Sequence, residues 1–295
     1  MILGLNLSFA VKRWLEPDVL ASMVSDRFGV KNVQFTFDLL DPWWPEFIRD
    51  GLAKRYKEAF AEKGVSIDSV FGGLASYTYP QFLSPFAEGR EAALIFFKRA
   101  VDMTLALGSK VMGTPVGGMS NRDANDPVRR SELYAEMLGL LKQLASYGKE
   151  KSLEQIHIEA TPLVTEFPHS PQASVKLMED LKDADIEFKL LIDWGHALYK
   201  PLLGPEADID LWFSKCGPYV GSIHLQQTDG LLDRHWDFTV EGILTPKMIK
   251  DATEKASLGD VGSYLEVVPA FESPDDEVGE RIKKSLDILR QGFDA

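Results

Sequence analysis

The 295-residue chain has a single cysteine and no excess of basic residues. Because Cys216 has no second cysteine to pair with, an internal disulfide is excluded, and this agrees with a reducing compartment such as the cytoplasm. The formal net charge of −13 provides no overall positive charge with which to follow the phosphate backbone of a nucleic acid. We therefore expect no nucleic-acid partner, and we interpret Cys216, near the end of a predicted helix, as structural.

Long apolar runs are missing as well. No stretch approaches the roughly 20 residues that a membrane-spanning helix needs. Residues 1–14 also lack the basic start and long apolar run of a secretory signal. We expect a soluble, cytoplasmic protein without a membrane partner. Hydrophobic residues nevertheless make up 45% of the chain, as in a globular protein with a sizeable core.

Short apolar runs alternate with longer amphipathic segments along the whole chain. The predicted strands are 2–8, 32–37, 66–72, 110–115, 155–160, 188–193, 222–227 and 263–268. The predicted helices are 17–28, 46–63, 88–107, 127–150, 171–183, 206–215, 245–257 and 275–292. Eight strand–helix units in a chain of this length predict a (β/α)8 barrel, an α/β fold with residues 1–295 in one domain. An open doubly wound sheet is the alternative, but no Gly-rich nucleotide loop follows any strand.

Four consecutive predicted strands carry an ionisable residue near their carboxyl end, where such barrels place functional groups. These residues are Glu159 in IHIEA, Asp193 in LLID, His224 in SIHLQQ and Glu266 in YLEVV. Each alone could be an ordinary salt bridge, turn cap or hydrogen-bonded group. Taking all four out of water at one end of a barrel is costly unless they share a ligand. The set therefore predicts a divalent metal site.

Three carboxylates and one imidazole offer mostly oxygen ligands. This favours Mn²⁺, with Mg²⁺, Co²⁺ and Zn²⁺ as alternatives. No HExxH, CxxC or GxSxG motif suggests a competing centre. Glu272 competes with Glu266 as the last ligand, and we prefer Glu266 because it lies inside the predicted strand.

The segments IHIEATP, LLIDWGH, GSIHLQQTDG and YLEVVPAFE, in this order, resemble those of the xylose isomerase-like TIM barrels, which include sugar-phosphate isomerases and epimerases. Within that superfamily the wider sequence is most similar to the tetrulose-phosphate racemases of erythritol catabolism. The resemblance implies that the four residues hold the metal and that Glu159 and Glu266 form an acid/base pair. It also implies that His196 contacts a substrate oxygen and Arg234 binds substrate, although Gly230 stands where the arginine of ketose epimerases is expected.

The resemblance implies a metal-dependent racemase or epimerase that acts next to the ketone of a short ketose phosphate, with tetrulose 4-phosphate as the expected substrate. A divalent ion would stabilise the enediolate formed when a carboxylate removes the proton. An aldose–ketose isomerase is an alternative, as is a decarboxylase or dehydratase of a 3-oxo sugar acid or cyclic polyol ketone. A sugar-binding barrel without catalysis also stays open. The net charge and the five histidines argue against a DNA-repair endonuclease of the same fold.

Several further residues lie in loops on the predicted active face. Lys12, Arg122 and Lys200 join Arg234 as groups that could hold a phosphate by charge-assisted hydrogen bonds, with solvated surface groups as the alternative. Trp194 is expected either to form a wall of the substrate pocket or to pack in the core. We expect a sugar or sugar phosphate as the small-molecule partner, and such barrels are often homo-oligomers, although no sequence feature indicates an interface.

Overall fold

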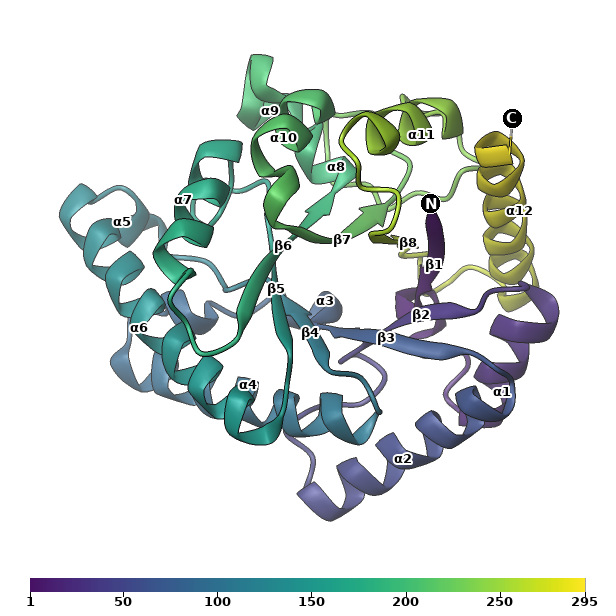
Figure 1. The fold of residues 1–295 in the computed structure, drawn as a ribbon, viewed down its shortest axis with the longest axis horizontal. Coiled ribbons are helices and arrows are strands. Elements are labelled where there is room, and N and C mark those ends of the chain that lie inside the picture. Colours follow the sequence, from purple (N-terminus) through teal and green to yellow (C-terminus); the bar gives the residue numbers. More distant parts are fainter. Residues whose placement is uncertain (295) are drawn as a thin grey trace.

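The computed structural model describes residues 1–294, in which eight strands close into a barrel in chain order (Figure 1). The strands are β1 (Ile2–Asn6), β2 (Asn32–Thr36), β3 (Ser66–Phe71), β4 (Val111–Thr114), β5 (Gln155–Glu159), β6 (Glu187–Asp193), β7 (Val220–Leu225) and β8 (Gly262–Leu265). Neighbouring strands are parallel, and β1 pairs with β8 to close the ring. The predicted (β/α)8 barrel is confirmed, and the open-sheet alternative is wrong.

An outer layer of helices surrounds the barrel (Figure 1). It consists of α1 (Pro17–Ser22), α2 (Glu46–Glu62), α4 (Ala87–Ala106), α6 (Pro127–Lys151), α7 (Pro171–Leu181), α10 (Ile209–Cys216), α11 (Pro246–Lys255) and α12 (Asp275–Asp294). Four short helices, α3 (Gly73–Ser76), α5 (Asn121–Ala124), α8 (Trp194–Ala197) and α9 (Lys200–Leu203), lie in loops that follow β3, β4 and β6. Among residues 1–294, no helix has the length and apolar character needed to cross a membrane.

Seven of the eight strands end earlier than predicted, and at β8 the difference affects a site residue. β8 ends at Leu265, so Glu266 lies one residue beyond the strand in which we expected it. Its backbone N–H still donates to the carbonyl of Leu225 in β7, at 2.9 Å. This hydrogen bond resembles those between paired strands. It holds Glu266 at the edge of the barrel although β8 ends one residue earlier.

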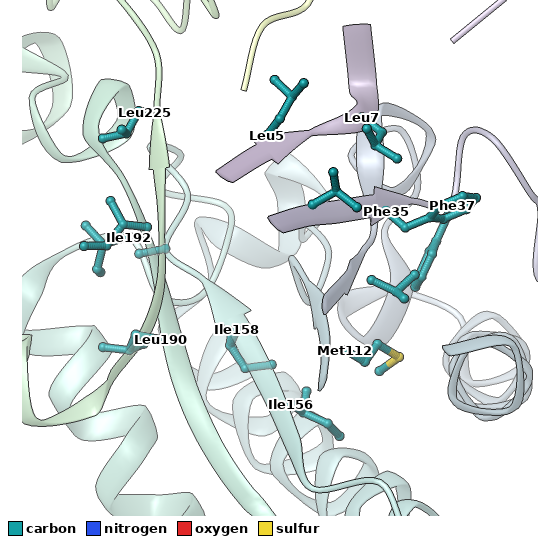
Figure 2. Packing of buried hydrophobic residues seen from close by; sticks show 14 of the residues in the cluster. Leu5, Leu7, Phe35, Phe37, Met112, Ile156, Ile158, Leu190, Ile192 and Leu225 are labelled. Atoms are coloured by element: carbon teal, nitrogen blue, oxygen red, sulfur yellow. The ribbon is translucent and has the colours of Figure 1, made fainter. Parts of the chain in front are cut away.

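The apolar core lies between the sheet and the helices, whereas the barrel interior carries polar side chains. Ile156 and Ile158 of β5 are fully buried in the core, together with apolar residues of the other strands (Figure 2). Successive strand residues point to opposite faces, so His157 and Glu159 point into the barrel. His157 Nδ1 accordingly lies 2.9 Å from Ser222 Oγ of β7, a strand that is not a neighbour of β5. This alternation explains why polar residues recur within apolar strands.

Cys216 lies where the sequence placed it, at the end of a helix. It is the last residue of α10, fully buried, with its thiol 3.7 Å from the carbonyl oxygen of Pro171. Burial raises the pKa of the Cys216 thiol to about 12. The thiolate that reacts with alkylating agents is therefore almost absent at neutral pH.

We expect Cys216 in the folded protein to react with iodoacetamide at pH 8 on the order of 1000-fold more slowly than in the denatured chain, because both burial and the raised pKa suppress the thiolate. Alkylation followed by intact mass spectrometry, with and without denaturant, measures the ratio. Rapid labelling of the folded protein would contradict the buried position.

Candidate metal centre and active site

Four residues predicted as metal ligands meet at the carboxyl end of the barrel. Glu159 ends β5, Asp193 ends β6, His224 is the last residue but one of β7, and Glu266 follows β8. Parallel pairing places Asp193 directly beside His224. All four side chains are buried. Glu272, the competing ligand, is exposed and is not part of this group.

The donor atoms of this group fit one divalent ion. Each side chain has one buried atom without a hydrogen-bond partner: Glu159 Oε1, Asp193 Oδ2, His224 Nδ1 and Glu266 Oε2. One ligand atom from each residue lies within 4.8 Å of the others. His224 Nδ1 is 2.8 Å from Glu266 Oε2, 3.5 Å from Glu159 Oε1 and 3.9 Å from Asp193 Oδ2. Ligands about 2.1 Å from a common octahedral centre stand roughly 3 to 4 Å apart.

The imidazole of His224 is oriented by a hydrogen-bond network of residues from the first three strands. Its Nε2 lies 2.6 Å from Oε1 of Gln34, an oxygen that also accepts a bond from Asn6 Nδ2 at 2.6 Å. The amide nitrogen of Gln34 donates to Ser69 Oγ at 3.1 Å. Since a carbonyl oxygen only accepts, His224 carries a proton on Nε2, and Nδ1 is the ring atom that faces the other ligands. Partners of this kind fix the tautomer of metal-binding histidines.

The three carboxylates favour a positive charge at their centre. Burial raises the pKa of Glu159 to about 7. For His224 burial alone would lower the pKa, but the facing carboxylates of Glu266 and Glu159 outweigh it and raise the pKa to about 10. The field that holds a proton on His224 equally attracts a metal ion, which would take the place of that proton.

A second group of possible ligands, which the sequence reasoning missed in part, adjoins the first. His196, Asp233 and His235 also bring ligand atoms within 4.8 Å of one another. Asp233 Oδ2 lies 3.2 Å from His196 Nε2 and 3.1 Å from His235 Nε2. Facing carboxylates overcome the effect of burial and raise the pKa of both imidazoles, that of His235 to about 9. In the sequence, the only indication of this group is that two possible ligands, Asp233 and His235, flank Arg234 in the loop after β7.

Gln226 connects the two groups. Its side-chain N–H₂ donates to Asp193 Oδ1 and to Asp233 Oδ1, both at 2.9 Å. Gly195 makes room for this amide, because a Cβ there would lie 2.5 Å from the Gln226 side chain. His196, predicted to contact substrate, is buried, and its Nδ1 lies 3.1 Å from the carbonyl oxygen of Ala160. The same ring is 3.6 Å from Glu159 Oε1.

The other predicted substrate contacts lie around the metal group rather than in it. Trp194 is fully buried in the core, with its ring 5.9 Å from that of Phe213 in α10, which fits the packing interpretation. The four cations are dispersed: Lys12 lies over the Phe271 ring, Arg122 is exposed on α5, Lys200 begins α9, and Arg234 pairs with Asp229 at 2.6 Å. Within residues 1–294 they form no ion pair with the four ligands.

A closed (β/α)8 barrel with converging carboxylates and imidazoles at its carboxyl end has the architecture of barrel enzymes, whose active sites lie at that end. The chain belongs to the xylose isomerase-like TIM barrel family, whose model matches residues 25–256.

Three known proteins are similar to this chain over most of their length. D-Erythrulose 1-phosphate 3-epimerase of Brucella abortus is 24% identical over 97% of this chain and 94% of its own. The crystal structure of a candidate xylose isomerase from Rhodospirillum rubrum is 46% identical over 99% of both chains, with a TM-score of 0.97. D-Psicose 3-epimerase of Clostridium cellulolyticum is 13% identical over 99% of both chains, with a TM-score of 0.74, and shows the shared fold.

Asp193→Asn should weaken Mn²⁺ binding by more than about 100-fold, because it removes charge from the ligand group. Gln34→Leu should weaken it by roughly 10- to 100-fold, the usual effect of removing an outer partner of a ligand. Isothermal titration of metal-free protein with Mn²⁺ measures both. The control is Asp183→Asn, an exposed residue after α7. Unchanged Mn²⁺ affinity in Asp193→Asn would contradict the site.

Proposed function

We propose that the protein is a divalent-metal-dependent epimerase or racemase that inverts the carbon next to the ketone of a short ketose phosphate. The convergence of the four predicted ligands carries the proposal, because each has one buried ligand atom without a hydrogen-bond partner. The named sugar epimerases among the relatives support the same class of reaction. Mn²⁺ is the proposed ion, because the site offers three carboxylates and one imidazole.

Glu159 and Glu266 are the proposed acid/base pair, one for each face of the substrate. Glu159 ends β5 and Glu266 follows β8, and these two strands are three apart in the ring. A divalent ion bound here would polarise the ketone and the neighbouring hydroxyl oxygen and so acidify the carbon-bound proton. One carboxylate takes that proton, the C–H electrons form the double bond of an enediolate, and the other carboxylate returns a proton from the opposite face. Return to the same carbon inverts it.

A four-carbon ketose phosphate is the proposed substrate. The Brucella abortus relative is named for a 3-epimerase of erythrulose 1-phosphate, and the carbon inverted there lies beside the ketone. The family resemblance implied a 4-phosphate, so both positional isomers need to be tested. Of the predicted cations, Arg234 and Lys200 are the ones proposed to hold the phosphate. Arg234 lies between Asp233 and His235, and the backbone N–H of Lys200 donates to the carbonyl of Gly230 at 2.9 Å.

With Mn²⁺ in D₂O, the wild-type protein should exchange the proton at carbon 3 of a tetrulose phosphate and invert that carbon. Glu159→Gln and Glu266→Gln should each lower the rate by about 100-fold or more, the usual size of a lost acid/base contribution. ¹H NMR follows exchange, and the exposed Glu272→Gln serves as the control. Absence of exchange across tetrulose and pentulose phosphates would refute the proposed reaction.

Arg234→Ala and Lys200→Ala test the phosphate contact. If either side chain binds phosphate, its removal should raise KM for tetrulose phosphate roughly 10- to 100-fold, the size of a lost bond to a charged group. KM for unphosphorylated tetrulose should stay unchanged, and Arg122→Ala provides the comparison with an exposed arginine. Equal KM changes for both substrates would assign the residue another role.

The alternatives use the same site and differ in their products. A decarboxylase would release CO₂ from a 3-oxo sugar acid, a dehydratase would release water, and an aldose–ketose isomerase would move the carbonyl. NMR of the reaction products distinguishes all three from inversion. The cytoplasmic location and the homo-oligomeric state stay predictions.

A further inference from the structure

We infer that Tyr77 is a positioning residue that holds the carboxylate of Glu159 for proton transfer. The inference rests on the proposed function, in which Glu159 exchanges a proton with substrate. The hydroxyl group of Tyr77 donates a hydrogen bond to Glu159 Oε2, across 82 residues of sequence. Tyr77 is half-buried and directly follows α3, which lies close to the barrel axis in Figure 1.

The two oxygens of Glu159 have different surroundings. Oε1 is buried without a hydrogen bond and lies 3.5 Å from His224 Nδ1, within the proposed ligand group. Oε2 is the oxygen on which Tyr77 donates. If Oε1 binds the metal, Oε2 is the oxygen left to accept the substrate proton. Tyr77 therefore contacts the atom of Glu159 that reacts.

The position of Tyr77 is set by Asp38, which follows β2. The carboxylate of Asp38 accepts bonds from the backbone N–H groups of Leu74 at 2.6 Å and Ala75 at 3.0 Å. Gly73 permits this contact, because it has a φ of +66° and a Cβ would lie 2.4 Å from Asp38 Oδ2. The N–H of Tyr77 in turn donates to the carbonyl of Leu74 at 3.2 Å. A short chain of hydrogen bonds thus joins β2 to the proposed base.

A bond from Tyr77 still leaves Glu159 able to accept a proton. A carboxylate oxygen has two lone pairs, so Oε2 can accept from the hydroxyl and still face the substrate. In the proposed step the proton passes from carbon to Oε2, the C–H electrons enter the enediolate, and Tyr77 keeps its own proton. The bond fixes which way the carboxylate faces, and small errors in such an orientation slow the reaction strongly.

The test compares Tyr77→Phe with Tyr79→Phe, a neighbouring tyrosine that is 62% exposed. With Mn²⁺-loaded protein and tetrulose phosphate, we expect Tyr77→Phe to lower kcat about 10- to 100-fold, as for a lost bond to a charged group. KM and Mn²⁺ affinity should change by less than about threefold, because only the proton-transfer step is affected. The primary isotope effect with substrate deuterated at carbon 3 should rise for the epimer that Glu159 deprotonates. Tyr79→Phe should match the wild type.

Two outcomes would overturn the inference. One is a kcat of Tyr77→Phe equal to that of Tyr79→Phe. The other is a loss of kcat without a larger isotope effect, which would make the role of Tyr77 merely structural. Asp38→Asn, which weakens the hold on α3 but keeps the tyrosine, should lower kcat by a smaller factor, with the same rise in isotope effect.

A second measurement keeps the inference separate from the proposed function. Crystal structures of Mn²⁺-loaded wild-type and Tyr77→Phe proteins compare the orientation of the Glu159 carboxylate without any substrate. The inference requires that the Glu159 carboxylate in the variant either rotates or adopts more than one orientation. An unchanged carboxylate would contradict it. Wild-type protein that is inactive on every ketose phosphate would refute the proposed function alone.

Discussion

Three carboxylates lie where the barrel excludes water, and the surrounding structure stabilises their charge. Burial of a carboxylate is costly unless hydrogen bonds or a cation compensate. In two of the three carboxylates, one oxygen accepts hydrogen bonds and the other faces the shared centre. Glu159 accepts from Tyr77 on Oε2, and Asp193 accepts from the N–H of His196 and from Gln226 on Oδ1. The remaining oxygen of each faces the shared centre, where a metal ion would supply the missing positive charge.

The two halves of the barrel contribute differently to this centre. The proposed ligands come from β5, β6, β7 and the end of β8, whereas β1, β2 and β3 supply the residues that orient them. Gln34 of β2 fixes the ring of His224, and Asp38 after β2 holds the segment that carries Tyr77. Closure of the ring between β1 and β8 therefore matters for chemistry as well as for stability, since it brings the orienting residues next to the ligands.

The fold and the ligand group could be predicted from sequence because both depend on local patterns. Alternating apolar runs and amphipathic helices define the barrel, and a polar residue at the end of an apolar strand marks each ligand. Glu266 was identified although it lies beyond β8, since its neighbours read as strand. Asp233 and His235 lie in an irregular loop, whose path no periodicity indicates. The contact of Tyr77 with Glu159 depends on how a loop after β3 is anchored, which only the three-dimensional structure reveals.

The short side chain of Asp193 has two roles, a helix cap and a proposed metal ligand. Its Oδ1 caps the first turn of α8 through the N–H of His196, 2.9 Å away, while its Oδ2 faces the ligand group. Asparagine could keep the cap but would lose the charge, and glutamate would carry the carboxylate one methylene too far from the cap. Homologues that bind the same ion should therefore tolerate no other amino acid here, whereas the hydrophobic residues that precede it in β6 can exchange among themselves.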